Sequence, residues 1–172
     1  MVTKEKGFSL SKDVSVWLAS AVILTTIYLF VATYLHQINV SFVLGPFDFS
    51  HWLAFVGTAF IVLYNPIYYI WKRRNPKRFQ SLLRIHVFGN LISVALITVH
   101  FAAQISRPPK HYPQLGTGIV LFAVLLILVV TGFAQRFRLM KNLRYWRFWH
   151  VGTVITFCLA IPVHILHGLK VI

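Results

Sequence analysis

Five long stretches of this sequence contain no Asp, Glu, Lys or Arg, and they constrain its fold more than any other feature. They cover residues 14–35, 51–71, 85–106, 114–135 and 148–169, and the shortest has 21 residues. A transmembrane helix needs about 20 consecutive apolar residues to cross the hydrocarbon core. We therefore predict an all-α polytopic membrane helical bundle with five transmembrane helices, in a single domain over residues 1–172.

The composition agrees with this reading. Hydrophobic residues make up 58% of the chain, and its mean hydropathy is +0.71. The first stretch is longer than the apolar core of a cleavable signal, and no small-residue cleavage site follows it, so we expect it to be retained. Gly45-Pro46 and Asn75-Pro76 predict loops between spans, and Pro66 and Pro162 are expected to lie inside helices.

The net charge of +14 is distributed very unevenly over the predicted topology. Fourteen of the 17 basic residues fall on one side: Lys4, Lys6, Lys12, Lys72, Arg73, Arg74, Lys77, Arg78, Arg84, Arg136, Arg138, Lys141, Arg144 and Arg147. The other side has Arg107, Lys110 and Lys170. This positive-inside pattern predicts a multi-pass plasma-membrane protein with a cytoplasmic N-terminus and an outer C-terminus. A basic surface against anionic headgroups accounts for the charge without nucleic acid.

Four histidines within the predicted spans form two equally spaced pairs. His86 and His100 are fourteen residues apart, and so are His150 and His164. Fourteen residues make nearly four helical turns, so the two members of a pair project from one face, about 21 Å apart along the axis. One span separates the two histidine-bearing helices, so they run parallel. His86 then lies level with His150, and His100 with His164.

This arrangement predicts two stacked haem b groups, each with two histidine ligands to its iron. His86 and His150 would ligate the inner haem, and His100 and His164 the outer haem. Neutral imidazole is a good iron ligand, and two such ligands leave no open axial position, which favours electron transfer over oxygen binding. His167 competes with His164, but its seventeen-residue separation from His150 turns it about 100° from the ligand face.

Other residues near these helix faces are candidate haem contacts with simpler alternatives. Phe157 lies seven residues from both ligands of its helix, so it either separates the two haems or packs in the core. Gly89 either admits a porphyrin close to the backbone or packs against a neighbouring helix. Arg84, Arg144 and Arg147 are candidates to pair with haem propionates, although they also serve the positive-inside pattern.

A second group of histidines, His36, His51, His111 and His167, is predicted near the outer face. They are candidates for a metal site or for docking an electron acceptor. Interfacial histidines are often simply solvated, and no ligand-like spacing links these four. We therefore do not expect them to share a metal ion.

Two segments together resemble a known family over about residues 70–170. The first has LLRIH at 82–86, then Gly89 and Val99-His100; the second has YWRFWH at 145–150 and IPVH at 161–164. They are similar to the ferric reductase-like transmembrane domain, which includes ferric reductases, NADPH oxidases and the haem subunit of bacterial methionine sulfoxide reductase systems. The resemblance implies that the four paired histidines ligate haem iron and that electrons pass from a cytoplasmic donor to an outer acceptor.

The sequence departs from that family where electrons would enter. Ferric reductases and NADPH oxidases usually continue into flavin and nicotinamide domains, but no Gly-rich phosphate motif occurs here. We expect an electron-transfer subunit of an oxidoreductase that receives electrons from a separate flavoprotein or iron–sulfur protein, or from a quinol. Three alternatives stay open: a quinol-linked cytochrome b subunit of a respiratory complex, a haem-free membrane anchor, and a metal-ion transporter, which the scarcity of intramembrane carboxylates disfavours.

Overall fold

The computed structural model describes residues 12–110, 115–137 and 141–169. It is 85% helical. In chain order its long helices are α1 (Lys12–Tyr34), α2 (Phe49–Arg74), α3 (Phe79–Ile105), α4 (Gly116–Arg136) and α5 (Leu143–Gly168). Within the described residues, these five helices are long and apolar enough to cross a membrane. The predicted all-α bundle of a multi-pass membrane protein is confirmed.

Several helices extend beyond the uncharged stretches from which they were predicted. α2 continues through Lys72, Arg73 and Arg74, and α5 begins at Leu143, next to Asn142, whose side chain accepts a hydrogen bond from the Tyr145 N–H. An uncharged stretch marks only the part of a helix that crosses hydrocarbon. Basic side chains extend into the headgroup region, so they can continue the same helix.

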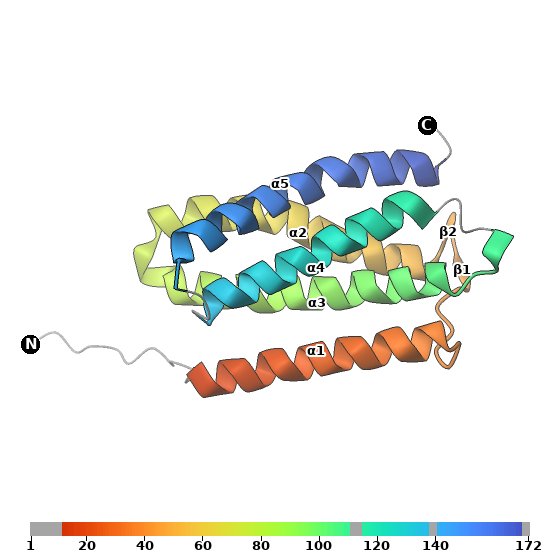
Figure 1. Ribbon diagram of the computed structural model, residues 1–172, viewed down its shortest axis with the longest axis horizontal. Helices are drawn as coiled ribbons and strands as arrows, with labels where there is room; N and C mark the ends of the chain where they lie inside the picture. The colour runs from red at the N-terminus through yellow and green to blue at the C-terminus, as the bar shows by residue number, and fades with distance from the viewer. Residues whose placement is uncertain (1–11, 111–114, 138–140, 170–172) are drawn as a thin grey trace, which may run out of the picture.

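The helices lie side by side along the long axis of the molecule (Figure 1). α1 and α2 both pack against α3, and α4 packs against α5. α1 lies at one side of the bundle and α5 at the opposite side (Figure 1). A buried cluster of Ile61, Leu125, Leu128, Phe157 and Ile161 joins α2, α4 and α5. Successive helices alternate in direction, so α3 and α5 run parallel, as predicted.

The loop predicted around Gly45-Pro46 contains a small β-hairpin. Its strands are β1 (Val43–Leu44) and β2 (Phe47–Asp48), which pair antiparallel. Gly45 has a φ of +65°, a left-handed conformation that glycine adopts without steric cost. The hairpin leads directly into α2. Pro66 and Pro162 lie inside α2 and α5, as expected.

The two ends of the bundle differ in charge. We call the end that holds the 3₁₀ helix η1 (Pro76–Arg78) the basic end, and the opposite one, with the β-hairpin, the hairpin end. The described basic residues at or near the basic end are Lys72, Arg73, Arg74, Lys77, Arg78, Arg84, Arg136, Lys141, Arg144 and Arg147. Arg107 and Lys110 lie at the hairpin end. The predicted residues Lys4, Lys6, Arg138 and Lys170 lie outside the described residues.

Candidate functional site

At the basic end, the histidines of α3 and α5 come together as the spacing predicts. The ring centroids of His86 and His150 are 6.4 Å apart, and the ring planes are at 82°. A metal ion bonded to one nitrogen of each ring at about 2 Å would separate the two centroids by about 6 Å. Both side chains are half-buried. The pair therefore has a separation at which one metal ion fits between two imidazoles.

Aromatic and cationic side chains surround this basic-end pair. The ring of Tyr68, on α2, stacks on His86 with a centroid distance of 4.3 Å. The Lys72 ammonium lies 4.8 Å from the centroid of the Tyr68 ring and is close enough to interact electrostatically with His86, His150 and Arg147. A cofactor with carboxylate groups would find favourable charge here.

Polar side chains on neighbouring helices contact the Nδ1 atoms of this pair. Thr131 Oγ1, on α4, is 2.9 Å from Nδ1 of His150. Asn90 Nδ2 is 3.2 Å from Nδ1 of His86, and Asn90 also exchanges hydrogen bonds with Asn65 of α2. The Thr131 contact resembles the hydrogen bond that a metal-ligating histidine makes through its second ring nitrogen. The Asn90 amide nitrogen can only donate, so Nδ1 of His86 is the acceptor in the other contact.

At the hairpin end, His100 and His164 line one cavity of about 250 Å³. This volume lies just below the usual range for ligand pockets, about 300–1,000 Å³. Phe157 and Ile161 lie on its wall, and Phe157 is only 1% exposed. Nδ1 of His164 is 3.1 Å from Thr117 Oγ1 on α4. His100 and His164, the second predicted pair, therefore lie on the wall of the same cavity.

A third histidine lies in the same cavity; the sequence predicted it near the outer face but did not indicate its approach to His100. His51 of α2 also lines the cavity, and its ring centroid is 4.8 Å from that of His100. Within the described residues, Nδ1 of His51, Nδ1 of His100 and Nε2 of Gln104 are buried without a hydrogen-bond partner. Because buried polar groups normally have partners, these three atoms fit a cavity that receives a polar ligand.

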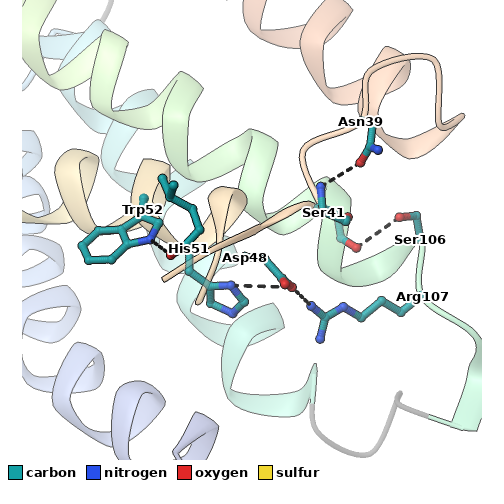
Figure 2. Close-up of polar contacts among 9 residues, drawn as sticks. Asn39, Ser41, Asp48, His51, Trp52, Ser106 and Arg107 are labelled. Carbon is teal, nitrogen blue, oxygen red and sulfur yellow. Dashed lines mark hydrogen bonds and ion pairs between the residues drawn. The ribbon is translucent and has the colours of Figure 1, made fainter. Parts of the chain in front are cut away.

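An ion pair joins the β-hairpin to Arg107, which also lines this cavity (Figure 2). Arg107 Nη2 lies 2.8 Å from Asp48 Oδ2, and His51 Nδ1 lies 3.9 Å from the same oxygen. On the other side of the hairpin, the Trp52 indole donates to the Leu44 carbonyl at 2.9 Å. These contacts connect the start of α2 with the end of α3.

The remaining predicted haem contacts lie in different surroundings. Gly89 faces Phe60 of α2, whose ring occupies the space that a Cβ would need, so helix packing accounts for this glycine. Arg84 lines a groove between α1 and α3, with Leu18 and Phe88. Arg147 is exposed, and its positive charge is close enough to act on the Lys72 ammonium. Arg144 is also exposed, in the first turn of α5.

The other predicted outer histidines lie on separate elements or outside the described residues. His36 follows the end of α1 with a φ of 57°, and His167 lies in the last turn of α5. His111 lies outside the described residues. In the part of the chain that the structure describes, no group of three or more His, Cys, Asp or Glu side chains could hold a metal ion. Haem needs only two axial protein ligands, because the porphyrin supplies the others.

Comparison with protein-family models, with curated proteins and with solved structures gives no match. The ferric reductase-like resemblance therefore stays a prediction, carried by the residues quoted for it.

Proposed function

We propose that this chain is a transmembrane electron-transfer cytochrome b subunit with two bis-histidine haem b groups. The observation that carries the proposal is the 6.4 Å separation of the His86 and His150 rings. His100 and His164 form a second pair of histidines, which line one cavity. Haem, when bound, supplies one-electron redox chemistry. The protein supplies axial nitrogens, an apolar surrounding and a fixed separation between the two sites.

The residues around each pair have distinct roles in this proposal. His86 and His150 hold one haem at the basic end, where Lys72 and Arg147 neutralise its carboxylates. His100 and His164 hold the other at the hairpin end. Phe157, which is 1% exposed, lies between the pairs and keeps water out of the space that an electron crosses. Its bulk excludes solvent that would otherwise stabilise charge in the bilayer.

The proposed orientation places the basic end in the cytoplasm of a plasma-membrane protein, following the positive-inside pattern. A separate flavoprotein, iron–sulfur protein or membrane quinol donates electrons there, and an acceptor receives them at the hairpin end. With the cytoplasm negative, moving one electron fully outward releases about 2.3 kcal/mol per 100 mV. The membrane potential therefore favours outward transfer.

Single histidine variants test this assignment. His150→Ala should remove the haem at the basic end and leave the other spectrally present, because a haem without one axial imidazole becomes high-spin or is lost. His164→Ala should do the reverse. His167→Ala is the matched control on the same helix and should keep both haems. Redox-resolved visible spectra of the purified variants measure this; loss of a haem in His167→Ala but not in His164→Ala would contradict the proposed ligand set.

A further inference from the structure

α4 carries a repeat that matches the histidine repeat of α5. Thr117-Gly118 and Thr131-Gly132 are fourteen residues apart, the same separation as His150 and His164. Because α4 and α5 are antiparallel, the first Thr-Gly pair meets His164 and the second meets His150. Each threonine hydroxyl lies within 3.1 Å of an Nδ1 atom. The two contacts therefore form one recurring arrangement rather than two unrelated hydrogen bonds.

The Thr131 contact identifies which atom donates. Thr131 Oγ1 lies 2.8 Å from the Ile127 carbonyl oxygen of its own helix, and a carbonyl can only accept. The single hydroxyl proton of Thr131 is thus used within α4, and its oxygen is left to accept a proton from His150. The Leu128 carbonyl oxygen lies 3.2 Å from the same hydroxyl and is a second backbone acceptor for its proton. The contact with Thr131 therefore favours the tautomer of His150 with the proton on Nδ1.

The glycines allow this contact by keeping the imidazoles close to the α4 backbone. A Cβ at Gly132 would lie 3.3 Å from Cε1 of His150, and a Cβ at Gly118 would lie 3.2 Å from Cε1 of His164. Both distances are tighter than ordinary packing. A larger residue would push each ring away from its threonine.

We infer that Thr131 and Thr117 are positioning residues that hold His150 and His164 with Nδ1 protonated and Nε2 presented as the iron ligand. The inference rests on the proposed function for the identity of the metal group. A hydrogen bond from Nδ1–H fixes the orientation of a ligand ring and raises its basicity. α4 thereby sets the ligand geometry at both sites, although it contributes no ligand of its own.

The first test reads the tautomer directly, without haem. In full-length protein prepared haem-free and labelled with ¹⁵N-histidine, NMR distinguishes protonated from unprotonated ring nitrogens. His150 should carry its proton on Nδ1, and Thr131→Val should shift it toward the Nε2–H form. Thr153→Val is the matched control, since Thr153 lies one turn from His150 and donates only to Trp149. An unchanged tautomer in Thr131→Val would overturn the inference.

The second test measures haem binding and potential. Thr131→Val should weaken haem retention at the basic end by about 10–100-fold, as loss of an outer-shell partner does in metal sites. The reduction potential of that haem should rise, because a less basic ligand stabilises the oxidised iron less. Thr131→Ser keeps the hydroxyl, so its haem retention and reduction potential should stay at the wild-type values. Thr117→Val should affect only the haem at the hairpin end.

The two proposals fail in different ways. Wild-type protein without haem would contradict the proposed function, while the NMR experiment would still decide the threonine contacts. Wild-type protein with two haems, combined with identical potentials in Thr131→Val and Thr153→Val, would overturn the positioning role alone.

Discussion

Gly132 of α4 lies against the imidazole of His150 on α5, so closely that a methyl group there would be 3.3 Å from Cε1 of the ring. The two residues belong to helices that pack along their length. The position of a candidate ligand is therefore set by the backbone of a neighbouring helix.

Gly132→Ala should displace the His150 ring by a few tenths of an ångström and weaken haem retention at the basic end. Alanine favours a helix over glycine by about 1 kcal/mol, so the helix itself should not become less stable. Gly152→Ala is the matched control, because a Cβ there meets nothing within 4 Å. Haem-to-protein ratios during washing with a competing haem acceptor measure the effect; equal loss in both variants would contradict it.

Gly89→Ala should destabilise the packing of α3 against α2, because the added Cβ would collide with the Phe60 ring. Overpacking of this kind typically costs about 1–3 kcal/mol. Thermal unfolding midpoints in detergent measure it. In the Phe60→Ala background the same glycine substitution should cost much less, and an equal cost in both backgrounds would show that Phe60 is not what Gly89 accommodates.

Asp48→Asn should loosen the β-hairpin by removing the charge that Arg107 pairs with at 2.8 Å. Both side chains are partly exposed, so the expected loss is about 1 kcal/mol or less. A double-mutant cycle with Arg107→Gln measures the interaction. The doubly substituted protein should unfold close to either single variant, whereas fully additive losses would mean that the two residues act independently.

Reporter fusions test the proposed orientation. A reporter in the 75–78 connection between α2 and α3 should be cytoplasmic, and one after Ile172 should be outside, because basic loops are retained on the cytoplasmic side. The reverse pattern would exchange the donor and acceptor ends of the proposed electron path.

Much of the fold could be predicted from the sequence, because uncharged length is a direct requirement of the bilayer. Helix ends were less predictable, since residues such as Lys72–Arg74 continue α2 into the headgroup region. The β-hairpin was not predicted, because strands of two residues carry no detectable periodicity.

The pairing of His86 with His150 followed from spacing and helix direction alone. The approach of His51 to His100 did not, because it depends on how α2 is rotated against α3, which side-chain packing decides. Phe60 at Gly89 is a similar case. The Thr-Gly repeat of α4 was not predicted to be functional, because only its contacts with His150 and His164 give it meaning.

Haem stoichiometry tests the central proposal most directly. A pyridine haemochrome assay on purified full-length protein, normalised to protein concentration, should give two noncovalent b haems per chain, since no CxxCH attachment motif occurs in the sequence. One haem per chain, or none, would contradict the account of two bis-histidine sites.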